Sequence, residues 1–236
     1  MIGTRIVLRR GAKDDAERPF WISFADLMTA LMVLFLVVMG VALLAVTKTV
    51  TERERIEEQH RQDIEALLKQ FEETAERYDG IRVFRDRRVI DFGDRARFAL
   101  DEWRLSPDQE TVLRQFVPEI LRLADSELGR RVLKRIVVEG YTDRTGTYLG
   151  NLNLSLQRSQ RVLCVMFATS GNALLTDEQK LQVRNLFLVG GYSFNATRDT
   201  DEASRRVEMR LEFLAPQELR PTPPDVNSRY GECALR

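Results

Sequence analysis

Apolar residues form one unbroken run near the N-terminus, whereas further along the chain they alternate with charged residues. The run from Phe24 to Val46 contains 23 residues, with no Lys, Arg or Pro and with Asp26 as its only acid. At about 1.5 Å per residue, such a helix crosses a hydrocarbon core of roughly 30 Å. A cleavable signal peptide has an apolar stretch of only about 7–15 residues. We therefore expect a retained transmembrane helix over residues 20–46, preceded by a polar tail at residues 1–19.

Residues 47–79 are highly charged and predict a helical linker with one apolar face. Its less polar positions recur at spacings of three, four and seven residues. They are Ile56, His60, Ile64, Leu67, Phe71 and Tyr78. Two interpretations stay open: a stalk that pairs with a second copy as a short coiled coil, or a helix that packs against its own C-terminal domain.

Beyond Gly80, helical and strand-like stretches alternate, which predicts an α+β domain over residues 80–214. The order β-α-β-α-β-β favours a sandwich with helices on one face of a sheet. The Pro-containing remainder, residues 215–236, predicts an irregular tail. The expected strands cover 81–93 with a tight turn at 85–88, 135–141, 186–194 and 205–213, and the expected helices cover 106–129, 151–171 and 177–183.

Composition excludes several function classes. Lys plus Arg and Asp plus Glu both total 36, so the net charge is zero and direct binding of nucleic acid is not expected. One His and two Cys argue against a Cys/His metal site, and the chain shows no motif for another metal or a cofactor. No nucleophile–base pair stands out, so we do not expect an enzyme.

Charge around the span gives a weak orientation signal. Five basic residues precede it and four follow within twenty residues, which favours a cytoplasmic N-terminus.

Asp26 is the unusual residue of the span, because an ionised Asp there costs about 2.5–3.5 kcal/mol on insertion scales. Thr29 and Ala30 share its helical face, and residues of this size let another helix approach closely. This face is consistent with a proton or ion site between subunits. The alternative is an acid near the membrane interface, since Asp26 lies only two residues inside the run.

The stretch "EGYTDRTGTYLGNLNLSLQRSQRV" carries the most definite chemistry of the C-terminal domain. Asp143 follows a strand, and Arg158 lies about two turns into the next helix. Together they could hold a zwitterion, with Asp binding an ammonium and Arg a carboxylate, and backbone N–H groups at the helix start adding an anion site. A structural Asp143–Arg158 salt bridge is the alternative from the residues alone.

This stretch resembles the OmpA-like peptidoglycan-binding domain, whose pattern is G-[YHF]-T-D-x-x-G-x(4)-N-x-x-L-S-x-x-R. The string "SRRVEMRLEF" is similar to that family's closing strand, with Ser204 where Asn is usual, and Tyr141 replaces a frequent His. The resemblance covers roughly residues 80–214. It implies that Asp143 and Arg158 bind the diaminopimelate-type end of the wall peptide, with Thr142, Asn151 and Leu154 as contacts. It also implies a periplasmic C-terminal domain and a cytoplasmic N-terminus.

The string "PFWISFADLMTALMVLFLVVM" resembles the membrane segment of flagellar stator B subunits (MotB-like), in which this Asp carries the ion. Together with "NLNLSLQRS", "LFLVGGYSFN" and "EASRRVE", it is typical of the stator-like subunit of the Zorya antiphage-defence system. The resemblance implies a homodimer inside a pentameric ring of a MotA-like multi-span partner. That assembly is an ion-driven rotary motor of the bacterial inner membrane, tethered to peptidoglycan. A single carboxylate without an oxygen-rich cage favours H⁺ over Na⁺.

Two alternatives to a defence motor stay open. A flagellar stator subunit would be needed for motility, and a passive wall anchor would not need Asp26.

Cys164 and Cys233 also allow two interpretations. Cys164 lies among apolar residues and is typical of a small core residue. In the oxidising periplasm the two could instead form a disulfide that pins the C-terminal tail.

Overall fold

The computed structural model describes residues 14–221, 230–233 and 235, with the backbone alone at residues 14–20 and 22. Most of the predicted N-terminal tail (residues 1–13) and part of the predicted C-terminal tail (222–229, 234 and 236) lie outside the described residues. The chain divides into two compact units, Met1–Ile56 and Glu57–Arg236. The second unit is called the C-terminal domain below.

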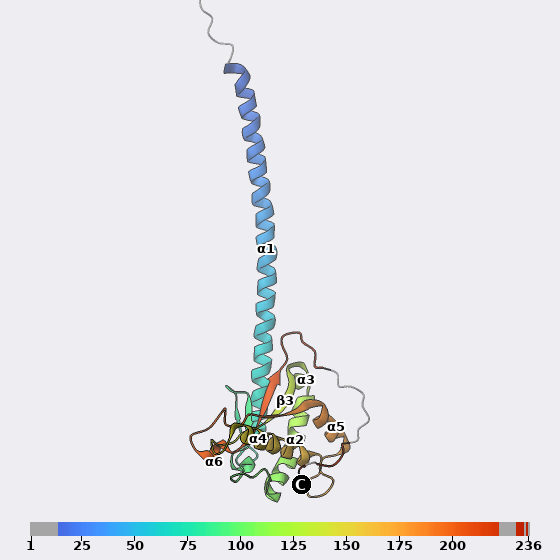
Figure 1. The fold of residues 1–236 in the computed structure, drawn as a ribbon. Helices are drawn as coiled ribbons and strands as arrows, with labels where there is room; N and C mark the ends of the chain where they lie inside the picture. Colours follow the sequence, from blue (N-terminus) through green and yellow to red (C-terminus); the bar gives the residue numbers. More distant parts are fainter. Residues whose placement is uncertain (1–13, 222–229, 234, 236) are drawn as a thin grey trace, which may run out of the picture. The chain divides into compact units, whose positions relative to one another are not determined.

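Helix α1 (Asp14–Ala75) is continuous through the predicted span and through the predicted linker as far as Ala75, four residues before the linker's expected end (Figure 1). Every described side chain between residues 23 and 50 is exposed. An apolar helix with such an exposed surface is suited to being surrounded by lipid or by another chain. Among the described residues, one helix is long and apolar enough to cross a membrane, with bounds Ser23–Ala75.

The last turns of α1 belong to the C-terminal domain. Ile64, Leu67, Leu68 and Phe71 are buried in its hydrophobic core. Polar contacts secure the same segment: Arg131 donates from Nε to Asp63 at 2.8 Å, and the ring of His60 lies 2.9 Å from the carbonyl of Leu214. The apolar face that left two interpretations open is therefore covered by the chain's own domain, so this face is not free to form a coiled coil.

The predicted α+β class is confirmed. One five-stranded sheet has the order β1-β2-β5-β3-β4, in which β3 and β4 are parallel and the other neighbours antiparallel. Its strands are β1 (Arg82–Phe84), β2 (Val89–Asp91), β3 (Leu133–Gly140), β4 (Phe187–Gly191) and β5 (Val207–Phe213). The helices of the domain are η1 (Gly93–Ala96), α2 (Pro107–Asp125), α3 (Glu127–Val132), α4 (Tyr148–Met166), α5 (Asp177–Leu186) and α6 (Asp201–Ser204).

Local capping explains most helix boundaries. Ser106 forms a capping box with Gln109 ahead of α2. The helix predicted over 151–171 begins earlier and ends earlier, at Tyr148 and Met166. The reason at its start is Thr147, whose hydroxyl accepts from the N–H of Gly150. The helix expected over 106–129 is broken at Ser126 into α2 and α3, and the four-residue helix α6 was not expected, because so short a helix carries little periodicity.

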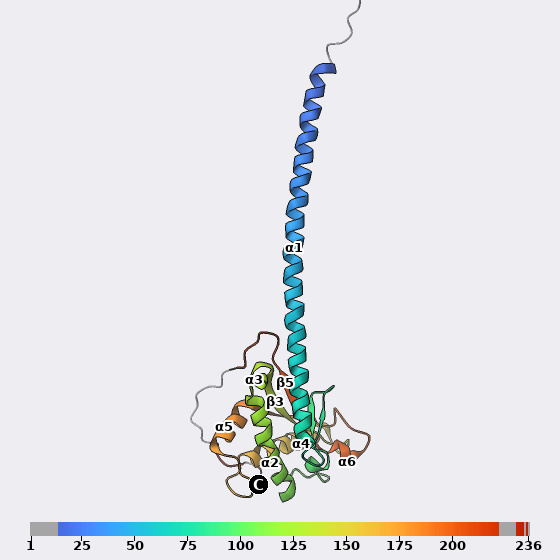
Figure 2. The ribbon, with the colours of Figure 1, turned by 180° about the vertical axis from the view of Figure 1, so that it is seen from behind.

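The sheet has two different faces. Apolar residues of β3 and β5, such as Ile136, Val138 and Met209, enter the core under the helices, and α4 packs on β3 and β4. Figure 2 shows β3 beside α3, which leads directly into it. The other face carries buried acids that are neutralised by arginines. Glu139 accepts two hydrogen bonds from Arg210, at 2.7 and 2.9 Å. Complete pairing makes such burial tolerable.

Candidate functional site

The loop between β3 and α4 holds the residues of the predicted wall site. At Gly140 the helix crosses the strand so closely that a Cβ would lie 1.9 Å from the carbonyl oxygen of Ser155, so only glycine fits. Gly146 has φ +93°, a backbone conformation that favours glycine. These two glycines let the chain leave the sheet, turn and enter α4 within a few residues, which places Asp143 beside the start of that helix.

Asp143 is buried, and both of its carboxylate oxygens have donors. Oδ1 accepts from the backbone N–H of Thr145 at 2.9 Å, and Oδ2 accepts from Nη1 of Arg205 at 2.8 Å. Burial alone would raise the pKa of Asp143, but these two donors together hold it below its usual value. Asp143 is therefore an ionised group that is already paired within the chain.

Arg158 is fully buried and binds backbone carbonyls. Nε donates to Glu102 at 2.8 Å, Nη1 to Tyr141 at 2.8 Å and Nη2 to Ala99 at 3.2 Å. Burial lowers the pKa of Arg158 to about 10, so the guanidinium stays charged at neutral pH. These contacts join the loop that contains residues 99–102 to the end of β3.

The sequence placed Asp143 and Arg158 opposite one another, either across an open cleft or in a direct salt bridge. Among the described residues the ion pair of Asp143 is made with Arg205, and Arg158 has carbonyl partners instead. The expectation that Asp143 and Arg158 face one another across an open cleft or form a salt bridge is therefore wrong. The reason is that α4 directs Arg158 toward the neighbouring loop, while the chain entering β5 brings Arg205 to the carboxylate.

The other predicted site residues lie around the same loop. Asn151 is buried and donates to the carbonyl of Thr145 at 2.7 Å, so it fixes the loop that holds Asp143. Leu154 is half-buried one turn further along α4. Thr142 is buried next to Asp143, and its hydroxyl oxygen has no hydrogen-bond partner among the described residues.

Arg205 is the residue of this site that sequence reasoning missed. It stands in the string "SRRVE" just before β5, 62 positions after Asp143. No periodicity links the two positions, and only the antiparallel pairing of β3 with β5 brings them together.

The membrane carboxylate has a different setting. Asp26 is exposed on α1 with Thr29 and Ala30 following on the same face, and within the described part of the chain its side chain makes no ion pair or hydrogen bond. Thr29 uses its hydroxyl to bond the carbonyl of Ala25 at 2.7 Å.

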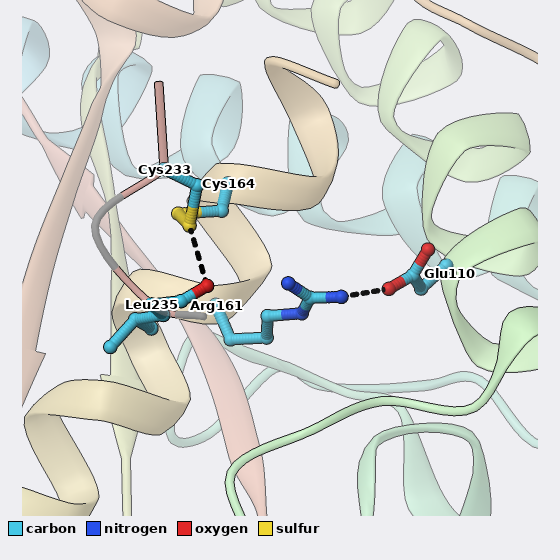
Figure 3. The surroundings of a disulfide bond; sticks show 5 residues. All are labelled: Glu110, Arg161, Cys164, Cys233 and Leu235. Carbon is cyan, nitrogen blue, oxygen red and sulfur yellow. Dashed lines mark hydrogen bonds and ion pairs between the residues drawn. A yellow bond between two sulfur atoms is a disulfide. The ribbon is translucent and has the colours of Figure 1, made fainter. Parts of the chain in front are cut away.

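A disulfide closes the end of α4. Cys164 and Cys233 are bonded, which realises the second of the two interpretations for these residues (Figure 3). Tyr230 lies against Phe167 with ring centroids 4.7 Å apart. A groove of about 770 Å³ borders the bond and is lined partly by Arg161, which pairs with Glu110 at 2.5 Å.

Comparison with known proteins gives a match to a family model over the membrane segment and a match to a curated relative over the whole chain. Residues 9–50 match the family described as membrane MotB of the proton-channel complex MotA/MotB. This segment includes Asp26. Over 245 aligned residues, covering 100% of this chain and 99% of the relative, the chain is 41% identical to the Zorya protein ZorB of Escherichia coli O139:H28.

Solved structures also resemble the C-terminal domain, with TM-scores below 0.5. The periplasmic domain of Helicobacter pylori MotB is 18% identical, with a TM-score of 0.38 and coverage of 54% of this chain and 83% of that one. The OmpA-like domain of FopA1 from Francisella tularensis is 20% identical, with a TM-score of 0.36 and coverage of 54% and 75%. Identity at this level across the full length of the E. coli relative shows that the chain belongs to the ZorB family of Zorya proteins.

Proposed function

We propose that this protein is the peptidoglycan-anchored subunit of an ion-driven, stator-like motor that acts in antiphage defence. In this proposal Asp26 carries the ion across the inner membrane, and the site around Asp143 and Arg158 holds the wall. The observation that carries the proposal is the position of Asp26: it lies inside the segment that matches the MotB membrane family, within a chain of the ZorB family.

The family assignment agrees with the expectation that the chain is not an enzyme. Its chemistry is that of binding and of charge transfer. A lone exposed carboxylate on an apolar helix costs free energy in lipid, and ionisable residues inside a membrane are usually functional. We infer that two copies of α1 stand inside a pentameric ring of a ZorA-type, MotA-like partner, which supplies the surroundings that Asp26 lacks in the isolated chain.

The mechanism follows from the charge of Asp26. An ion that enters from the periplasm neutralises the carboxylate on one of two copies, and this lowers the cost of moving it past an apolar partner surface. Release into the cytoplasm restores the charge and engages the next partner subunit. Each monovalent charge that crosses 100 mV supplies about 2.3 kcal/mol. The wall contact provides the fixed reference against which the partner ring turns. We propose H⁺ as the ion, because one carboxylate without a cage of further oxygens suits a proton.

The orientation belongs to the same proposal. Wall binding requires a periplasmic C-terminal domain and hence a cytoplasmic N-terminus. The disulfide between Cys164 and Cys233 supports it, since such bonds persist in the periplasm and are rare in the cytosol.

The test is phage plating on cells that carry the complete operon with the wild-type chain, Asp26→Asn or the control Glu52→Gln, at matched protein levels. Glu52 is an exposed acid of α1 beyond the apolar run. We expect Asp26→Asn to abolish protection and Glu52→Gln to retain it, with motility unchanged in all three. Full protection by Asp26→Asn would leave a passive wall anchor as the better description, and loss of motility on deleting the chain would favour a flagellar stator.

A further inference from the structure

The carboxylate of Asp143 has a resident cation. Nη1 of Arg205 lies 2.8 Å from Oδ2, and the two side chains are 13% and 4% exposed. A ligand that presents an ammonium to Asp143 must therefore meet an oxygen that is already bound by a guanidinium. The other oxygen is not vacant either, because it accepts from the backbone of Thr145.

Arg205 has a second acidic partner on the solvent side. Its Nη2 donates to Glu202 at 3.3 Å, and the side chain of Glu202 is 68% exposed. Its Nε donates to the carbonyl of Phe98 at 3.2 Å. A small movement could transfer the guanidinium from Asp143 toward Glu202 without leaving it unpaired. Arg158 has no comparable exposed acidic hydrogen-bond partner among the described residues, because its donors are held by three backbone carbonyls.

Thr142 provides an independent sign that the site is incomplete in this state. Its hydroxyl oxygen is buried and has no partner in the described residues, although its backbone N–H donates to Ser193 at 3.0 Å. Buried hydroxyl groups are normally hydrogen-bonded, and an exception calls for a reason. A polar ligand group that enters beside Asp143 would supply the missing partner.

We infer, on the basis of the wall-binding function proposed above, that Arg205 gates Asp143. The ammonium of a diaminopimelate-type ligand replaces the guanidinium on the carboxylate, and Arg205 moves to Glu202. The gate also makes the site selective, because only a cationic group can replace the ion pair that is lost. A neutral amide leaves Asp143 with a weaker partner than the one it had.

The experiment measures binding of the full-length chain in detergent to purified peptidoglycan sacculi with diaminopimelate stems, and to free diaminopimelate. The variants are Arg205→Gln and Glu202→Gln. The control is Arg122→Gln, since Arg122 pairs with Glu119 three residues before it, as Arg205 does with Glu202, but on the surface of α2. We expect Arg205→Gln to bind about tenfold more tightly than wild type, the effect of removing one charged competitor. Glu202→Gln should bind more weakly, and Arg122→Gln should match wild type.

The outcomes separate this inference from the proposed function. Wild-type binding without tighter binding by Arg205→Gln overturns the gate and keeps the wall site. Loss of binding in Arg205→Gln, with its thermal unfolding unchanged, would make Arg205 a ligand contact and also overturn the gate. No binding by any variant would overturn both proposals. If Arg205→Gln does not fold, Glu202→Gln decides, because equal or tighter binding by that variant contradicts the gate.

Discussion

Asp26 in the membrane helix and Asp143 in the C-terminal domain are the two acids on which the proposed function depends, and their surroundings are opposite. Asp26 is exposed on a helix whose described side chains from residue 23 to 50 are exposed and mostly apolar. Asp143 is buried, with a donor on each oxygen. In the proposed function the two sites are therefore incomplete in different ways. Asp26 receives its partners from another chain or an ion, whereas Asp143 gives up a partner when a ligand binds.

The largest expected effect separates the two acids in one experiment. Asp26→Asn should remove phage protection entirely and leave sedimentation with peptidoglycan unchanged. Asp143→Asn should weaken wall binding by about tenfold or more, because the loss of a charged hydrogen-bonding partner costs about 1.5–3 kcal/mol. The measurement is phage plating together with sedimentation on peptidoglycan, carried out on four proteins: wild type, Asp26→Asn, Asp143→Asn and the control Glu52→Gln. Equal loss of wall binding in both variants would mean that the two regions are not independent.

The next effect distinguishes the two halves of α1. Phe71→Ala should reduce the free energy of unfolding of the C-terminal domain by about 3–5 kcal/mol, because the ring is fully buried in the core. Leu44→Ala, at an exposed position of the same helix, should leave that unfolding unchanged. Urea denaturation of the full-length chain in detergent, followed by near-UV circular dichroism, tests both. A dimeric coiled coil in place of the packed helix would instead give unfolding that depends on protein concentration.

The disulfide should contribute up to about 4 kcal/mol, since it closes a loop between residues 69 positions apart and restricts the unfolded chain. Cys164→Ala combined with Cys233→Ala should lower the melting temperature of the C-terminal domain and should leave the helical content of the membrane segment unchanged. Mass mapping under non-reducing conditions checks the bond itself. Two free thiols in protein extracted without a reducing agent would contradict the pairing.

The smallest expected effect is the pH dependence that Asp143 adds to stability. Its pKa is lower in the folded chain than its ordinary value of 3.8, so the unfolded chain binds the proton more readily. The stabilising contribution is therefore complete above that ordinary pKa and is lost as the pH falls through the lower folded value. Urea titrations at pH 6, 4 and 3 measure the free energy of unfolding. The difference in this free energy between wild type and Asp143→Asn should become smaller as the pH falls. A difference that is constant with pH would mean that the ion pair with Arg205 does not form.

Sequence patterns were sufficient where a structure depends on neighbouring residues. The tight turn at residues 85–88 lies between β1 and β2, and α2 begins at Pro107, within one residue of the expected start at 106. Patterns failed where the partners are distant. The apolar face around Leu67 was recognised, but what covers it was open, because a helical stripe looks the same whether a second copy or its own domain packs on it.

The candidate site shows the same limit at the level of side chains. The spacing of Asp143 and Arg158 identified two residues of one loop-and-helix unit, yet it could not show that Arg158 would bind three carbonyls. Those carbonyls belong to Ala99, Glu102 and Tyr141, and two of them come from a loop more than fifty residues away.

The sequence by itself determined the apolar helix with its single acid, the α+β class and the loop that presents Asp143. These features depend on local composition, periodicity and short spacings. Only the tertiary structure decided that the end of α1 joins the domain core, that Cys164 meets Cys233 and that Arg205 pairs with Asp143. The physical reason is that such contacts depend on how strands pair and helices pack over long separations, and the energy of each contact is realised only when the whole domain is assembled.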